Sequence, residues 1–189
     1  MPPLQLPAPP LADEVVLLRP WDVDDVPDQI MQFADPSVVR FSWPHTTPYL
    51  EEYAWTFFRE QERARRDGEE LNFAFVDPGA PATVFGGGSL YGIDLHERRA
   101  SVGYWLAPAH RGRGIATRAT RLMARWGFSE LGVGRIELTC GPDNRASQRV
   151  AERVGFAREG VLRSHIAFKG GRRDSVIYSL LPADLPETA

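Results

Sequence analysis

Hydrophobic and polar residues in the first half of the chain switch between strand-like and helix-like spacing. Residues 15–19 form a short apolar run that Pro20 ends, because proline cannot donate a hydrogen bond to a sheet. Residues 48–66 carry apolar side chains at helical spacing, which predicts an amphipathic helix that stops at Gly68. Two paired strands are predicted after it, at residues 71–76 and 83–93. The second of these contains three consecutive glycines, which predict a bulge or a close backbone approach.

The second half of the chain predicts the centre of a sheet. Residues 99–106 place alternate side chains on opposite faces, as a central strand does. Helices are predicted at residues 114–131 and 144–154, and further strands at 135–140, 156–168 and 172–181. This mixed order of elements implies an α/β or α+β fold, in which helices cover both faces of one sheet.

An acidic stretch lies between the first strand and the long amphipathic helix and predicts a helix start at residues 22–28. Asp24 is the expected N-cap, and Pro27 then falls in the first turn, where its missing N–H does no harm. The four aspartates of this stretch also suggest a metal site. However, the stretch lacks the glycine and the terminal glutamate of a calcium loop, so we expect no metal.

Composition and charge narrow the class of protein. The chain has 189 residues, enough for one domain, with 22 basic and 25 acidic residues and a net charge of −3. Such a balance provides no global basic field for nucleic acid or for an anionic membrane, so we expect neither as a partner. Cys140 is the single cysteine and cannot form an intramolecular disulfide, which fits a reducing compartment. The expected location is therefore the cytoplasm.

The N-terminal end of the chain differs from its middle in composition. Five of the first ten residues are proline, and no charged and apolar leader precedes them. The longest apolar runs are far shorter than the roughly 20 residues needed to span a membrane. We therefore expect an N-terminal tail at residues 1–14, one domain at 15–182 and a C-terminal tail at 183–189.

The loop between the predicted central strand and the next helix carries the clearest chemistry. It is rich in glycine and arginine, and it leads directly into a helix N-terminus. Gly112 and Gly114 would let the backbone approach a ligand, while free N–H groups and the helix dipole favour an anion such as a pyrophosphate. Neither the Gly-Lys-Ser/Thr of a Walker loop nor the glycine spacing of a dinucleotide fold is present.

Three motifs in order resemble the GNAT acyltransferases, most closely the RimJ/RimL type that acetylates the N-termini of ribosomal proteins. They are Arg111-x-x-Gly114-x-Ala116, then Asn144-x-x-Ser147 followed by Gly155-Phe156, and finally Asp174 with Tyr178-Ser179-Leu180-Leu181. The resemblance covers about residues 15–182. It implies a mixed, mostly antiparallel sheet of about seven strands with a splayed central pair, flanked by four helices. It also implies acetyl-CoA as co-substrate and direct transfer to an amine.

The same resemblance assigns roles to individual residues. The backbone of Leu106 would pair with the pantetheine arm as an added strand. Asn144 would bond to the pantetheine, and Ser147, one helical turn further on the same face, would protonate the leaving thiolate. Asn144 is also a natural helix cap, and the two roles are compatible. The residues that would hold the pyrophosphate are Arg111, Gly112, Arg113, Gly114, Ile115, Ala116 and Thr117.

The group that removes the proton from the acceptor amine is less evident. Glu137 lies on the opposite strand face from Cys140, which we interpret as a small buried side chain. His165 occupies the region in which the family can carry a catalytic glutamate. Glu137 and His165 are therefore the two candidates for the base.

Without a strong base, the chain is better suited to an amine of low pKa. An α-amine needs only about 1.4 kcal/mol to become neutral at pH 7, whereas a lysine needs about 4.6 kcal/mol. We therefore expect the acceptor to be a protein N-terminus or a small-molecule amine. The aromatic loop at residues 40–47 borders the acceptor pocket in the family, so Trp43 and His45 are candidate acceptor contacts.

Alternatives stay open at this level. The chain could be a non-catalytic module that binds or senses acyl-CoA, or a transferase that uses another donor such as succinyl-CoA. Arg163 and Lys169 are the cations that could receive a succinyl carboxylate. The long final hairpin and the proline-rich tail could also serve a homodimer.

Overall fold

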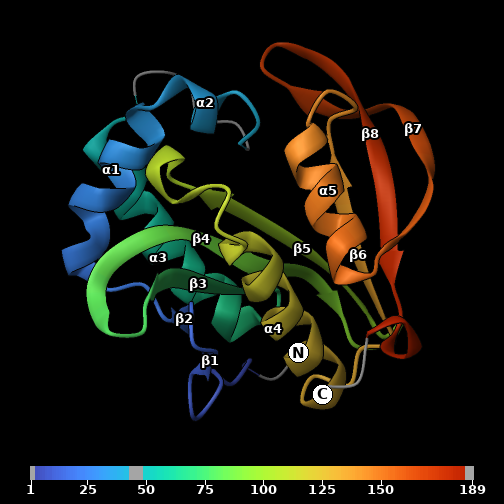
Figure 1. The fold of residues 1–189 in the computed structure, drawn as a ribbon, viewed down its shortest axis with the longest axis horizontal. Helices are drawn as coiled ribbons and strands as arrows, with labels where there is room; N and C mark the ends of the chain where they lie inside the picture. Colours follow the sequence, from blue (N-terminus) through green and yellow to red (C-terminus); the bar gives the residue numbers. More distant parts are fainter. Residues whose placement is uncertain (1–2, 43–48, 186–189) are drawn as a thin grey trace.

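The computed structural model describes residues 3–42 and 49–185. Among them, eight strands form one sheet in the order β1-β2-β3-β4-β5-β6-β8-β7 (Figure 1). Neighbouring strands run antiparallel everywhere except between β5 and β6. The strands are β1 (Leu11–Ala12), β2 (Leu17–Arg19), β3 (Glu70–Asp77), β4 (Ala80–Asp94), β5 (Arg99–Leu106), β6 (Arg135–Cys140), β7 (Ala157–Phe168) and β8 (Gly171–Leu180). The helices are α1 (Val26–Ala34), α2 (Pro36–Val39), α3 (Glu51–Asp67), α4 (Ile115–Ser129) and α5 (Arg145–Val154).

The two parallel strands in the middle of the sheet separate along their length. β5 and β6 pair only at their first residues, and the last pair joins Ser101 to Glu137. Beyond this pair β5 continues to Leu106 and β6 to Cys140 with no paired residues between them. This confirms the expected splayed central pair. It leaves unpaired backbone groups in the middle of the sheet, where a ligand can add to a strand edge.

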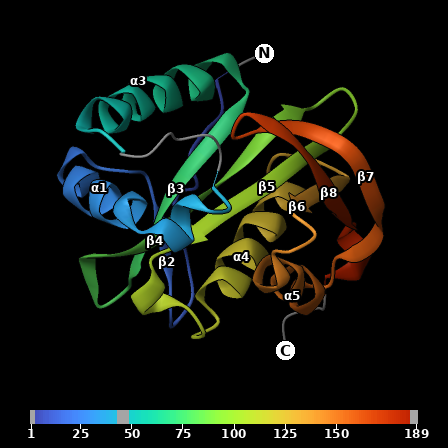
Figure 2. The ribbon, with the colours of Figure 1, turned by 90° about the horizontal axis from the view of Figure 1, so that it is seen from above.

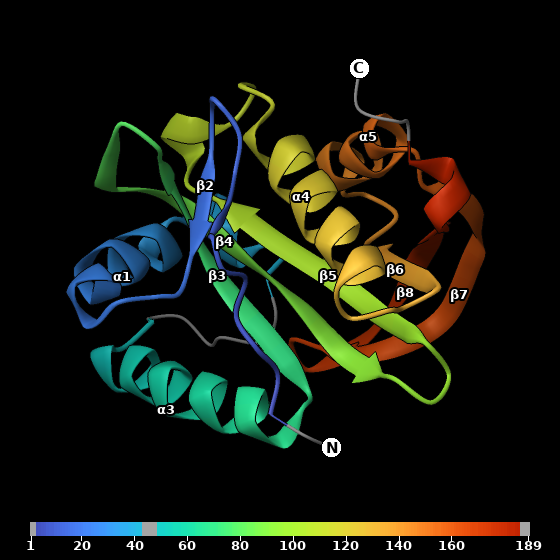
Figure 3. The same cartoon turned by 90° about the horizontal axis from the view of Figure 1, so that it is seen from below.

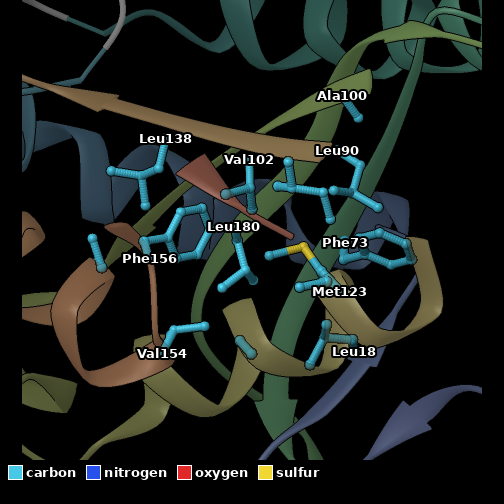
Figure 4. Close-up of a cluster of buried hydrophobic side chains, with 14 of the residues drawn as sticks. Leu18, Phe73, Leu90, Ala100, Val102, Met123, Leu138, Val154, Phe156 and Leu180 are labelled. Carbon is cyan, nitrogen blue, oxygen red and sulfur yellow. The ribbon is translucent and has the colours of Figure 1, made fainter. Parts of the chain in front are cut away.

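Helices cover both faces of the sheet, as predicted (Figure 2). On one face, α4 and α5 pack on alternate residues of the strands to form the main hydrophobic core. Met123 of α4, which is fully buried, points toward Phe73, Leu90 and Val102 in Figure 4. This core fixes α4 beneath the splay, and therefore fixes the position of its N-terminus.

The opposite face carries α1 and α3, seen to one side of the strands in Figure 3. Ala74 and Val76 of β3 point to this side and pack with Trp21, Phe57 and Trp105. The alternation between the two faces of β3 explains why that strand reads as almost continuously apolar in the sequence. Two separate cores therefore hold the sheet in place.

The three glycines of β4 mark a close approach, as predicted. Trp21 and Trp105 stack with ring centroids 5.6 Å apart. A Cβ on Gly87 would lie 2.4 Å from the ring of Trp21, and one on Gly88 would lie 2.5 Å from the ring of Phe75. Larger residues would displace these rings, so the glycines make room for aromatic packing on both faces of the strand.

The start of α1 differs from the sequence prediction. Asp22, and not Asp24, caps the 3-10 turn Val23–Asp25, and Asp25 is the N-cap residue of α1 itself. The side chain of Asp22 accepts the N–H of Asp24, and the carboxylate of Asp25 accepts the N–H of Asp22. This reciprocal pair forms a short 3-10 turn that leads into α1. Pro27 lies in the first turn of α1, as predicted.

The proline-rich N-terminal segment lies against the rest of the fold. Leu4 is buried in the main core, and its backbone exchanges hydrogen bonds with the backbone and side chain of Arg65 on α3. β1 then pairs with β2. The segment thus adds an edge strand that sequence patterning does not predict, because two residues are too few for a period.

A buried ion pair joins β2 to the start of α1. Arg19 donates two hydrogen bonds, of 2.7 and 2.8 Å, to the carboxylate of Asp25, whose side chain is only 5% exposed. We expect Arg19→Ala to lower the free energy of unfolding by about 3 kcal/mol, because the carboxylate stays buried without its partner. Denaturant unfolding measures this.

A matched control is available on α3. Arg63 also pairs with carboxylates, those of Glu60, Asp67 and Glu69, but its side chain is 56% exposed. Arg63→Ala should therefore change the free energy of unfolding by less than about 1 kcal/mol. Equal losses in the two variants would show that burial does not set the strength of the Arg19 pair.

Candidate functional site

A cavity of about 1100 Å³ opens at the splay and extends on both sides of it. It collects residues from strands β3 to β8, from the N-terminal end of α4, and from α1, α2, α3 and α5. The predicted site residues that line it are Leu106, Arg111, Gly112, Gly114, Ile115, Ala116, Thr117, Glu137, Asn144, Ser147 and His165. Trp43 and His45 lie outside the described residues. The fold therefore brings most of the predicted site into one space.

The loop before α4 forms a cradle for an anion. Gly112 and Gly114 adopt left-handed backbone angles, with φ of 75° and 79°, and Gly114 is the N-cap of α4. The first backbone bond of the helix runs from the N–H of Arg118 to the carbonyl of Gly114. The three N–H groups before it, of residues 115–117, therefore have no partner within the helix. With no acidic residue in the first turn, this end of the helix favours negative charge.

The side chain of Arg111 stabilises this loop through hydrogen bonds. Its guanidinium donates two hydrogen bonds, of 3.0 and 3.1 Å, to the carbonyl of Leu106, and one of 2.9 Å to the hydroxyl of Ser37. The side chain thus ties the loop to the end of β5 and to α2. It fixes the shape of the loop and places a positive charge beside it.

Two further arginines of this region point elsewhere. Arg113 does not line the cavity, and its guanidinium lies 5.7 Å from the ring centroid of Phe85. Arg118 is engaged by the carboxylates of Asp13 and Glu14, at 2.9 and 2.6 Å. The motif therefore contributes backbone groups and Arg111 to the cavity, and the side chain of Arg113 is not among the lining groups.

The edge of β5 presents backbone groups to the splay. The N–H of Ala107 donates to Phe85 of β4, at 2.9 Å. Because polar groups alternate along a strand, those of Leu106 point to the other side, where β6 has diverged. The carbonyl of Leu106 accepts from Arg111, so its N–H is the group that faces the open space.

A serine and a tyrosine meet on the α5 side of the splay. The carboxamide oxygen of Asn144 accepts the N–H of Ser147 at 3.1 Å, so Asn144 is the cap of α5. The hydroxyl of Ser147 lies 3.0 Å from that of Tyr104. Burial raises the pKa of Tyr104, against a hydrogen bond with Ser147, so the phenol stays protonated. Tyr104 was not among the predicted residues, because alternation along β5 places it simply on the core face.

Cys140 lies beside this pair and is buried, as predicted. Burial raises the pKa of its thiol, although hydrogen bonding with Ser147 and the charge of Arg173 both oppose this. A thiolate is the reactive form of cysteine, so the environment disfavours a nucleophilic role.

Glu137 and His165, the two candidates for the base, both line the cavity but lie at different distances from the splay. Glu137 is on β6 at the last paired position of the splay, and its carboxylate accepts a hydrogen bond of 2.8 Å from Arg135. His165 is on the edge strand β7, which β8 separates from β6, and it is exposed. Of the two, Glu137 lies nearer to the point where the strands diverge.

Metal ligands do not gather in the described ranges. No group of three or more histidine, cysteine, aspartate or glutamate side chains there could hold a metal ion. None of the described helices has the length and apolar character needed to cross a membrane.

Comparisons with known proteins identify the family of the chain. Residues 16–157 match a family model described as an acetyltransferase (GNAT) domain. The chain is 39% identical over 93 residues to the "Putative ribosomal N-acetyltransferase YdaF" of Bacillus subtilis, an alignment that spans 49% of this chain and about half, 51%, of that protein. It is 36% identical over 125 residues to the "Probable N-acetyltransferase YjcK" of the same organism, covering 66% of this chain and 68% of the relative.

A solved structure resembles almost the whole fold. Mycobacterium smegmatis RimJ, in complex with CoA-disulfide, superposes with a TM-score of 0.83 at 26% sequence identity. The match covers 98% of this chain and 88% of that one. Similarity therefore extends over nearly the whole fold described above.

Proposed function

The chain belongs to the GNAT acetyltransferase family, and from this premise we propose that it transfers an acetyl group from acetyl-CoA to a primary amine. The observation that carries the proposal is the single cavity that joins the anion cradle of α4 to the Tyr104–Ser147 pair through the splay. A donor with a phosphate end and a thioester end fits such a space. The acceptor then reaches the thioester from the α1 and α3 side, so both substrates are bound together.

The donor would be held by groups of three kinds. The N–H groups at the start of α4 bind the pyrophosphate. The N–H of Leu106 pairs with the pantetheine arm, which takes the place of the missing strand between β5 and β6. The carboxamide nitrogen of Asn144 is available to the same arm, because only the oxygen is used in the cap. The CoA-disulfide complex of the M. smegmatis relative supports a CoA-type donor.

In the chemical step, the neutral amine attacks the thioester carbonyl carbon. A C–N bond forms, the C–S bond breaks, and the amine gives up its proton to Glu137. The leaving thiolate takes a proton from Ser147, which the neighbouring phenol of Tyr104 can resupply. Direct transfer is favoured over an acyl-cysteine intermediate, because Cys140 is buried and its pKa is raised.

The acceptor in this proposal is a protein N-terminal α-amine or a small-molecule amine. A carboxylate is by nature a weak base, and Glu137 is held in place by Arg135. Deprotonating an amine of pKa near 8 at pH 7 costs little free energy, whereas deprotonating a lysine costs about 3 kcal/mol more. A non-catalytic acyl-CoA module would not need the hydroxyl pair that meets the thioester end of the cavity.

One observation favours a second donor. The guanidinium of Arg173 lines the cavity beside Cys140, and its Nε is buried without a hydrogen-bond partner. Neither Arg163 nor Lys169 lines the cavity. A succinyl carboxylate would satisfy Arg173, so succinyl-CoA is the alternative donor to compare.

The proposed function is tested by incubating the purified protein with acetyl-CoA or succinyl-CoA and a set of amines. The set contains a peptide with an N-terminal serine, the same peptide with a blocked N-terminus and an internal lysine, and spermidine. Release of CoA with a matching mass increase on an amine is the expected result. Donor binding without transfer to any of them would favour the non-catalytic alternative, and efficient transfer to the internal lysine would overturn the assigned acceptor class.

Glu137→Gln should lower kcat/KM near pH 7 by about a hundredfold, because it removes the proposed base. The loss should shrink above pH 8, where a larger fraction of an α-amine is already neutral. His165→Gln is the matched control and should retain activity at every pH. A pH profile of kcat/KM for both variants checks this, and a deficit in His165→Gln alone would reverse the assignment.

A further inference from the structure

A row of side chains crosses the sheet at the level where the splay begins. Glu70 of β3 is opposite Tyr91 of β4, Tyr91 is opposite Ser101 of β5, and Ser101 is opposite Glu137 of β6. Directly opposite residues in neighbouring strands point to the same face. All four line the cavity. The row therefore forms a floor that leads from the reaction centre, at Glu137, out to Glu70.

Tyr91 covers the middle of this floor. A Cβ on Gly103 would lie 3.3 Å from the ring of Tyr91, so the ring extends over that glycine toward β6. Its hydroxyl lies close to Ser101 and Thr139, near the splay, and the charges of Glu70 and Glu137 both act on it. Tyr91 thus spans the space between the two carboxylates.

The two carboxylates differ in what balances their charge. Glu137 is paired with Arg135. Within residues 3–42 and 49–185, no lysine, arginine or histidine lies at ion-pair distance from Glu70. Burial raises the pKa of Glu70, and interactions with the side chains of Ser89 and Asn72 oppose this only in part. A half-buried carboxylate without a cation is unfavourable, and a cationic ligand would stabilise it.

Aromatic side chains line another part of the same cavity, further along the strands from Glu70. They are Phe33 of α1, Tyr49 just before α3, Phe57 of α3 and Trp105 of β5. Phe33 lies 4.8 Å from Tyr49 and 5.2 Å from Trp105, centroid to centroid. Aromatic faces attract ammonium groups and the alkyl chains attached to them.

From this arrangement we propose that Glu70 binds a second cationic group of the acceptor, at a distance from the nitrogen that is acetylated. The strands of Glu70 and Ser101 are two spacings apart, about 10 Å, so Glu70 cannot touch a nitrogen that reacts at the splay. The acceptor class is then an amine with a further positive charge several bonds away. This inference rests on the proposed function, because it takes the splay as the place of acetyl transfer.

The test compares amines of equal length that differ in their second group. Cadaverine, the corresponding amino alcohol and pentylamine are titrated calorimetrically into the wild-type protein, both free and with CoA bound. We expect cadaverine to bind at least about tenfold more tightly than the other two. In Glu70→Gln its affinity should fall to that of the amino alcohol.

Glu69→Gln is the matched control. Glu69 is the adjacent residue, its side chain is 57% exposed, and it does not line the cavity. The substitution removes the same charge nearby and should leave the preference for cadaverine intact. Glu70→Asp, which keeps the charge but shortens the side chain, should retain part of the preference and shows that a loss in Glu70→Gln is not a loss of folding.

Equal affinity of the wild-type protein for the three amines, or an unchanged preference in Glu70→Gln, would overturn the inference. These outcomes are separate from the fate of the proposed function. The amine titrations are informative with the free protein, whereas donor binding and acetyl transfer are measured independently of them.

Discussion

We expect that replacing Gly114 with valine will weaken acetyl-CoA binding by more than about a hundredfold while the chain stays folded. Gly114 caps α4 with a φ of 79°, which a β-branched residue adopts only under strain. A Cβ at this position meets no atom of the protein within 4 Å, so it would project into the space that the pyrophosphate needs. Relaxing the strain would also turn the N–H groups of the first helical turn away from the anion. Calorimetric titration with acetyl-CoA and a thermal melt measure the two effects.

Gly132→Val is the matched control for strain. Gly132 has a φ of 69° and an equally open Cβ position, but it does not line the cavity. The two variants should lose similar thermal stability, and only Gly114→Val should lose acetyl-CoA binding. Affinity of Gly114→Val within about tenfold of the wild type would show that the cradle before α4 is not the donor site.

Ser147→Ala should lower kcat by about a hundredfold and leave the affinity for acetyl-CoA within about tenfold. The hydroxyl of Ser147 lies 3.0 Å from that of Tyr104 and lines the cavity at the proposed thioester end. Removing it leaves the departing thiolate without its proton donor, while the cap of α5 is kept because it uses the backbone N–H of residue 147. Steady-state rates and a parallel acetyl-CoA titration separate the two quantities.

Two further variants test whether the decrease in kcat comes from the hydroxyl of Ser147. Tyr104→Phe keeps the serine but removes its partner, so we expect a smaller decrease in kcat than in Ser147→Ala. Ser129→Ala removes a hydroxyl at the exposed end of α4, outside the cavity, and should have no effect. Full turnover in Ser147→Ala would mean that the thiolate is protonated by another group, and an equal loss in Ser129→Ala would indicate a general effect on stability.

The regular elements are the part of the fold that the sequence predicts best. The bounds of β5 and β6 agree with their predicted ranges, because both alternate over their full length. The expected cap of α5, Asn144, is also confirmed. α2 was missed because four residues contain no helical period. The cap before α1 was misplaced because three neighbouring aspartates offer similar spacing, and only the reciprocal bonds of Asp22 and Asp25 distinguish them.

In the site, as in the fold, residues that are close together in the sequence can be predicted, whereas residues that meet only in the folded sheet cannot. The cradle before α4 is continuous in sequence, so glycine spacing and the helix start suffice to locate it. Tyr104 and Tyr91 could not be identified in this way, since their neighbours belong to other strands and depend on register. Glu70 is the clearest example: its position in the sequence is an ordinary strand start, and its half-buried place on the cavity floor follows only from the folded sheet.

The most direct test of the whole account is a calorimetric titration of the purified protein with acetyl-CoA, with succinyl-CoA titrated alongside it. We expect one donor molecule to bind per chain with a dissociation constant in the micromolar range, and acetyl-CoA to bind at least as tightly as succinyl-CoA. Absence of binding for both donors would contradict the account, because the cavity at the splay would then hold no acyl-CoA.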